Sequence, residues 1–141
     1  MNELTITDPT FATLADQVLF TPVEVKHGRK FKGFGYVVGS YEKSNGGYSG
    51  SGVRPLKYYE VVRVYIPTSK GFDSYNEYEE SEKVEIPEEQ RRKDLLDYVN
   101  GVLKAALKRC GNDRKWRANY LRKVLEISGE PVVALLNFMD R

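Results

Sequence analysis

The strongest constraint on the fold of this chain is a change of hydrophobic period near Pro87. Upstream, the stretch 57–67 (KYYEVVRVYIP) alternates between two sets of side chains, as a β-strand does. Downstream, apolar residues recur at helical spacing, and the run Pro87-Glu88-Glu89 is typical of a helix start. Strands that precede helices in this way predict an α+β protein.

The β part is predicted to be an antiparallel meander, or a small SH3-like barrel, of four to five strands. A tight turn at 26–29 would join the first two strands, because Gly28 tolerates positive φ. The glycine-rich stretch 44–52 interrupts the pattern and reads as a hairpin connection, although its backbone N–H groups are also compatible with a phosphate cradle. The predicted strands cover residues 17–26, 30–42, 57–67 and 82–87.

The C-terminal part is predicted to form two to three helices. Gly111 should end the first, and Asn112 or Asp113 should cap the second. The third, 131–139, is apolar nearly all round and should be buried in the core or against another subunit. The expected apolar stripes are Leu95, Val99, Val102, Leu103, Ala106 and Cys110 on the first helix, and Trp116, Tyr120, Leu121, Val124 and Leu125 on the second.

A length of 141 residues suits one compact domain. We divide it into an N-terminal segment (1–15), an antiparallel β unit (16–86) and a helical region packed on that unit (87–141). Cys110 is the only cysteine, so an internal disulfide is excluded and a reducing compartment is favoured. With neither a membrane-spanning run nor a signal peptide apparent, we expect a cytoplasmic protein without membrane contact.

Charge is strongly segregated along the chain, although the formal net charge is only +2. Counting Lys and Arg against Asp and Glu gives 9 − 3 = +6 for 17–70, 1 − 8 = −7 for 72–89 and 8 − 1 = +7 for 104–123. Such blocks indicate either an anionic partner or charge pairing within the molecule. The sequence leaves these two readings evenly balanced.

The stretch 29–38 (RKFKGFGYVV) matches six positions of the RNP1 octamer of RNA-recognition motifs. That family places RNP1 on its third strand, and the residues before Lys32 leave no room for the strand, helix and strand that must come first. The last octamer position is also Gly39 instead of an aromatic residue. We therefore interpret the match as coincidental.

The stretch 23–42 (VEVKHGRKFKGFGYVVGSYE) resembles the hairpin of SH3-like barrels, including KOW-type modules. The likeness rests on Gly28, Gly33 and the run 35–37 (GYV), and it spans residues 17–86 at most. The spacing of the glycines departs from the KOW pattern, and the loop 44–54 is longer than expected. The resemblance implies a binding module and specifies no ligand.

Candidate ligand contacts combine cationic and aromatic side chains. Lys32, Phe34, Tyr36 and Val38 share one face of the second strand, and a cation beside two rings suits phosphate neutralisation with base stacking. The competing interpretation places these rings on the inward side of the sheet. The predicted ligand-binding residues are Lys32, Phe34, Tyr36, Arg54, Arg63, Phe72, Arg114 and Arg117.

The sequence offers little catalytic machinery. His27 is the only histidine, and Cys110 lies on the apolar side of a helix. We expect neither an enzyme nor a metal or other cofactor. The leading hypothesis is a non-catalytic protein that binds nucleic acid or a free nucleotide. The alternative is a protein-interaction or inhibitor module, of the kind carried by phages and plasmids, acting through the acidic, tyrosine-rich loop 72–82. In either case we expect a homo-oligomer, whose acidic and basic surfaces could meet across its interface.

Overall fold

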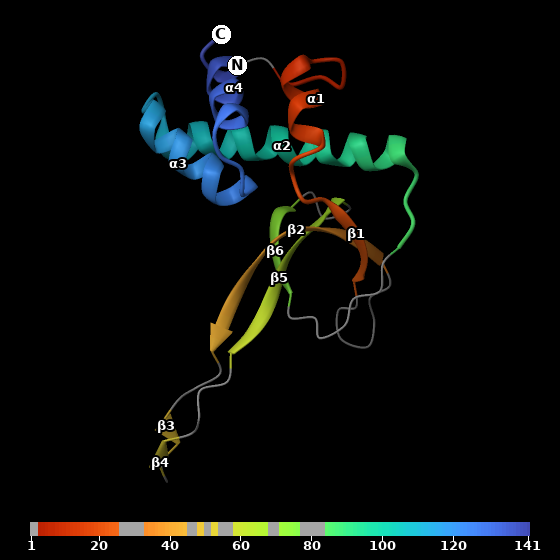
Figure 1. Ribbon diagram of the computed structural model, residues 1–141, viewed down its shortest axis with the longest axis vertical. Coiled ribbons are helices and arrows are strands. Elements are labelled where there is room, and N and C mark those ends of the chain that lie inside the picture. The colour runs from red at the N-terminus through yellow and green to blue at the C-terminus, as the bar shows by residue number, and fades with distance from the viewer. Residues whose placement is uncertain are drawn as a thin grey trace.

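The computed structural model describes residues 3–25, 33–44, 48–49, 52–53, 58–67, 71–76 and 84–141. Strands occupy the middle of the chain and helices its two ends (Figure 1). The predicted α+β class is confirmed. In chain order the elements are α1 (Pro9–Ala15), β1 (Thr21–Val25), β2 (Gly33–Ser44), β3 (Tyr48–Ser49), β4 (Gly52–Val53), β5 (Tyr58–Ile66), β6 (Gly71–Asn76), α2 (Glu88–Cys110), α3 (Arg114–Leu125) and α4 (Glu130–Met139).

The main sheet has four antiparallel strands in the order β1-β2-β5-β6. Its edge strands are β1 and β6, and no ladder joins them within the described part of the chain, so the alternative of a closed SH3-like barrel is wrong. Strands β2 and β5 form the longest pair and run away from the helices (Figure 1). The small ladder of β3 and β4 lies within the glycine-rich stretch that was predicted to be irregular.

Three local predictions differ from the structure. The segment 1–15, in which no element was expected, contains α1, which Asp8 caps by accepting a hydrogen bond from the Thr10 N–H. Residues 71–76 form β6, whereas 72–82 was predicted to be a loop. Residues 84–87 form no strand; the Val84 N–H instead donates to the Pro22 carbonyl at 3.3 Å, alongside the edge of the sheet.

The helix ends follow the predicted signals. Helix α2 begins after Pro87 and ends at Gly111, whose φ of 57° is the left-handed conformation that glycine adopts readily. Asp113 caps α3 by accepting a hydrogen bond from the Trp116 N–H at 3.1 Å. Helix α3 ends at Leu125, because Glu126 turns the chain with a φ of 54°.

One hydrophobic core joins the helices to one face of the sheet. Rings from the sheet meet rings from the helical side: Phe20 stacks on Tyr36 with centroids 4.0 Å apart, and Tyr65 lies 5.0 Å from Tyr98 of α2. On the opposite face of the sheet, Val23 and Val64 form a smaller buried cluster. The core therefore fixes the side chains of β2 and β5 that point toward the helices.

Helix α4 is buried within the single chain. Its apolar residues Val132, Leu135, Leu136, Phe138 and Met139 are all buried, while Val133 is 49% exposed. The intramolecular core thus accounts for the apolar character of 131–139, and a homo-oligomer stays a prediction.

Candidate nucleic-acid interface

Two of the three rings predicted to hold a ligand, Tyr36 and Phe34, occupy different environments. Tyr36 is fully buried between Phe20 and the helices, and Phe34 is half-buried with its ring edge-on to Tyr36 at 5.6 Å. A side chain without exposed surface cannot stack on a base, so the placement of Tyr36 favours the competing core interpretation. Phe34 retains an exposed part and lines a cavity described below.

Tyr36 also has a hydrogen-bonding partner inside the protein. Its hydroxyl donates to Asp94 Oδ2 of α2 at 2.6 Å, and Gln90 Nε2 donates to Asp94 Oδ1 at 3.0 Å. Burial, followed by the hydrogen bond to Asp94, raises the pKa of Tyr36 well above its ordinary value. Tyr36 thus remains a neutral donor that links the sheet to α2.

Arg63 of β5 is engaged at the C-terminus of α3. Its Nη2 donates to the Val124 carbonyl at 3.1 Å and lies 3.8 Å from Glu126 Oε1. A cation here suits the negative end of the helix dipole. Gly39 makes room for this contact, since a Cβ at that position would lie 2.6 Å from Arg63 Nη2. Arg63 therefore has a structural role in the described protein.

Arg114 and Arg117 both bind the end of α4. Arg117 is buried and donates to Asp140 Oδ1 at 2.7 Å, while Arg114 pairs with the other Asp140 oxygen and donates to Asn137 Oδ1 at 3.0 Å. The hydrogen bond from Arg117, assisted by the charges of both guanidinium groups, lowers the pKa of Asp140 despite a smaller opposing effect of burial. These two arginines fasten α3 to α4.

The remaining predicted contacts are not brought together by the structure. Lys32 and Arg54 lie outside the described residues, and Phe72 lies on the edge strand β6. Of the loop 72–82 proposed for protein contacts, residues 77–82 are likewise outside the described part. The predicted set of eight residues therefore does not form one site among the residues described.

A different basic surface lies on the outward side of α3. Residues 115, 119 and 122 follow one another at i, i+4 and i+7, and 116 and 123 continue the same side of the helix. Trp116 is 64% exposed, the largest fraction among the exposed large apolar side chains. We call this surface the α3 outer face; its residues are Lys115, Trp116, Asn119, Arg122 and Lys123, and all are exposed.

The cations of the α3 outer face have no acidic partner within the described part of the chain. The Arg122 guanidinium donates to the neutral Asn119 Oδ1 at 3.2 Å, and neither Lys115 nor Lys123 forms an ion pair there. The nearby Asp113 carboxylate is engaged as the helix cap. At one border of the face, the Arg109 guanidinium lies 5.8 Å from the centre of the Tyr120 ring. The face thus combines free positive charge with accessible aromatic surface.

Sequence reasoning gave the residues of this face different roles. Lys115 and Arg122 fall in the basic block 104–123, for which an anionic partner was one of two interpretations. Trp116 was assigned to the apolar stripe, and that assignment is wrong. Trp116 lies at the border between the buried and exposed sides of a short helix, where helical spacing decides little. The available signal was its position between Lys115 and Arg117, two charged neighbours within the first turn.

The described residues contain no group of three or more His, Cys, Asp or Glu side chains able to hold a metal ion. Among the helices that the structure describes, none is long and apolar enough to cross a bilayer. No protein-family model, curated protein or solved structure matches this chain.

Proposed function

We propose that this protein binds single-stranded nucleic acid, without catalysis, through the α3 outer face. The observation that carries the proposal is the exposed Trp116 among three cations that have no acidic partner in the described part of the chain. Cations attract the phosphates, and an accessible indole ring stacks on bases.

The geometry of the face favours a polymer over a free nucleotide. Lys115 and Lys123 are eight positions apart, which corresponds to about 12 Å along a helix at 1.5 Å per residue. Charge spread over that length suits successive phosphates of a strand. A free nucleotide is held more effectively in a concave pocket, which buries most of its surface.

Single-stranded nucleic acids are favoured over duplexes as ligands, because Trp116 needs an accessible base on which to stack. In a duplex the bases are stacked on one another, whereas in a single strand they are free to stack on aromatic side chains. Each base–aromatic stack contributes about 1–3 kcal/mol. DNA and RNA share this chemistry, and both should bind.

Fluorescence anisotropy of a labelled oligothymidylate and an oligouridylate tests the proposal. We expect a combined Lys115→Gln, Arg122→Gln and Lys123→Gln variant to bind at least about tenfold more weakly than the unmodified protein. The slope of log affinity against log salt should become shallower by about 2, since each phosphate contact to a single strand contributes about 0.7.

A matched control removes three charges elsewhere. The combined Arg91→Gln, Arg92→Gln and Lys93→Gln variant also loses three positive charges, but these lie on α2, away from the α3 outer face. This variant should retain binding. If both variants lost the same affinity for the oligonucleotides, the loss would be explained by net charge alone and not by the α3 outer face. Absence of binding by the unmodified protein would contradict the proposal, and equal affinity for a duplex would contradict the role of base stacking.

A further inference from the structure

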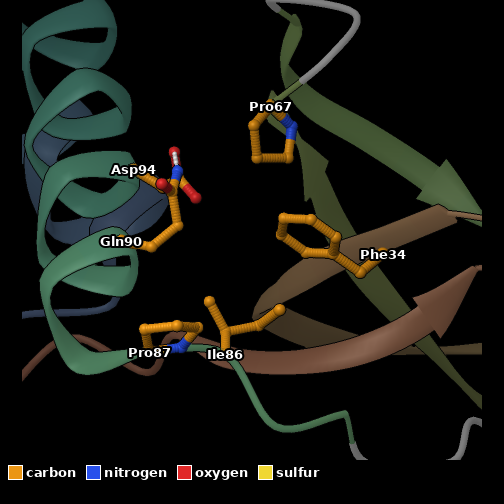
Figure 2. Close-up of a pocket in the computed structure, with 6 residues that line it drawn as sticks. All are labelled: Phe34, Pro67, Ile86, Pro87, Gln90 and Asp94. Atoms are coloured by element: carbon orange, nitrogen blue, oxygen red, sulfur yellow. Dashed lines mark hydrogen bonds between the residues drawn. The ribbon is translucent and has the colours of Figure 1, made fainter.

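An open pocket lies at the N-terminal end of α2, between that helix and the sheet (Figure 2). It is a cavity of about 530 Å³, a volume within the usual range for small-molecule sites. Phe34 of β2 faces the helix across the opening, and the polar groups belong to α2 (Figure 2). The lining residues are Phe34, Pro67, Ile86, Pro87, Gln90 and Asp94.

The polar wall of this cavity is formed by Asp94 and Gln90. Asp94 is only 5% exposed, and its two oxygens accept hydrogen bonds from the Tyr36 hydroxyl and from Gln90 Nε2. Because the Tyr36 hydroxyl and the Gln90 amide each direct a proton at Asp94, they orient its carboxylate. A carboxylate with two oxygens retains further acceptor capacity, and the Gln90 amide also carries a carbonyl oxygen.

The charge of Asp94 has no cationic partner among the described residues. Its neighbour Arg91 directs its guanidinium to Glu88, at 2.9 Å and 3.3 Å. The ion pairs of α2 in the described chain involve Glu88 and Lys104, both away from Asp94. A bound phosphate or carboxylate would therefore face a carboxylate that no ion pair of the described residues neutralises, whereas a cation would complement it.

We propose that this cavity binds a small organic ammonium ion with an aromatic or branched hydrocarbon body. The hydrocarbon part lies between Phe34, Ile86 and the two prolines, where apolar surface is removed from water. The ammonium group donates to the Asp94 carboxylate and to the Gln90 carbonyl oxygen, and its three protons match this acceptor-rich wall. The site is independent of the nucleic-acid face, since it uses the first turns of α2 and none of α3.

Three probes of similar size and different charge test the proposal on the unmodified protein: 2-phenylethylammonium, the neutral 2-phenylethanol and the anionic 3-phenylpropionate. Titrations followed by ¹H–¹⁵N correlation spectra should show saturable shifts at the Gln90 side-chain amide and at Phe34. We expect the ammonium to bind at least about tenfold more tightly than the alcohol. The carboxylate should cause no saturable shift.

Asp94→Asn should reduce ammonium affinity at least about tenfold and leave the affinity for the alcohol unchanged. The control is Asp97→Asn, which alters an exposed carboxylate one turn further along α2 and should leave both affinities unchanged. If Asp94→Asn fails to fold, the three-probe comparison decides alone. Equal binding of alcohol and ammonium, no saturable shift with the ammonium, or full ammonium affinity in a folded Asp94→Asn protein would overturn the proposal.

Discussion

The two sides of α3 contain the same kinds of residue in opposite situations. Arg114 and Arg117 bind Asp140 at the end of α4, whereas Lys115, Arg122 and Lys123 face solvent without an acidic partner among the described residues. The first pair holds two helices together, so it is not free to bind a ligand. Of the two groups, only the second can bind an external anion without breaking an ion pair of the described chain.

This difference separates two groups of cations in the part of the basic block 104–123 that forms α3. Charge pairing explains the inward arginines, and the outward cations remain available for the anionic partner that we propose. Counting charges along the sequence cannot separate these two groups of cations, because adjacent cations such as Arg114 and Lys115 belong to different groups.

The largest effect on stability should come from the inward side of α3. Leu121 is fully buried, and Leu121→Ala should lower the free energy of unfolding by about 3 kcal/mol through lost transfer energy and the remaining cavity. Urea denaturation followed by circular dichroism measures the change. A loss below about 1 kcal/mol would show that this side of the helix is not part of a packed core.

Trp116→Ala provides the contrasting substitution on the outward side of the same helix. Because Trp116 is 64% exposed, its removal should change the free energy of unfolding by no more than about 0.5 kcal/mol. The same variant should bind single strands more weakly, since it lacks the stacking ring. A strongly destabilised Trp116→Ala protein would contradict the distinction between the two sides.

An intermediate effect is expected at Asp140, where both inward arginines converge. Asp140→Asn should lower the melting temperature measurably, because it leaves the buried Arg117 without its ionised partner. Arg122→Gln, on the outward side, should leave the melting temperature unchanged. A melting temperature unaffected by Asp140→Asn would mean that the arginine pair contributes nothing to holding α3 on α4.

The same carboxylate predicts a dependence on pH. The pKa of Asp140 is lowered in the folded state, so its contribution is complete above the unfolded pKa of about 3.9 and is lost as the pH falls through the folded pKa. Thermal melts from neutral to acidic pH should give different melting temperatures for the unmodified protein and Asp140→Asn. The two melting temperatures should become equal only below about pH 4. Convergence at a higher pH would contradict this assignment.

A further change in stability concerns the contact between the sheet and the end of α3. An alanine Cβ at position 39 would lie 2.6 Å from Arg63 Nη2 and 2.8 Å from Glu126 Oε1, so both side chains would have to move. Gly39→Ala should therefore cost about 1 kcal/mol, comparable to the loss of the hydrogen bond from Arg63 to Val124. Arg63→Met in the Gly39→Ala background should add little if the two changes act on one contact.

Local signals in the sequence predicted much of the helical region. Pro87, Gly111 and Asp113 marked the ends of α2 and the start of α3 because capping depends on neighbouring residues. The start of α1 carried a comparable signal in Asp8-Pro9, which the sequence reasoning overlooked. The antiparallel pairing of β1 with β2 and of β2 with β5 also followed from local alternation.

The roles of the predicted ligand contacts were harder to predict because they depend on partners distant in sequence. The buried Arg117 donates a hydrogen bond to Asp140, and the buried Tyr36 donates one to Asp94. The two residues of each pair are 23 and 58 positions apart in the sequence, respectively. No local pattern identifies such pairs, so residues engaged inside the fold were taken for ligand contacts. Closure into a barrel is similarly a property of the whole sheet, whose order leaves β1 and β6 as edges.

The proposed binding surface for a nucleic-acid strand is the outward side of α3. Trp116 is the only tryptophan of the chain, so its intrinsic fluorescence reports directly on this face. Titration with oligothymidylate at about 50 mM salt should quench the Trp116 fluorescence until the quenching reaches a plateau. Raising the salt to about 200 mM should reverse most of the quenching. A Trp116 signal that oligothymidylate leaves unchanged, although iodide still quenches it, would contradict the account.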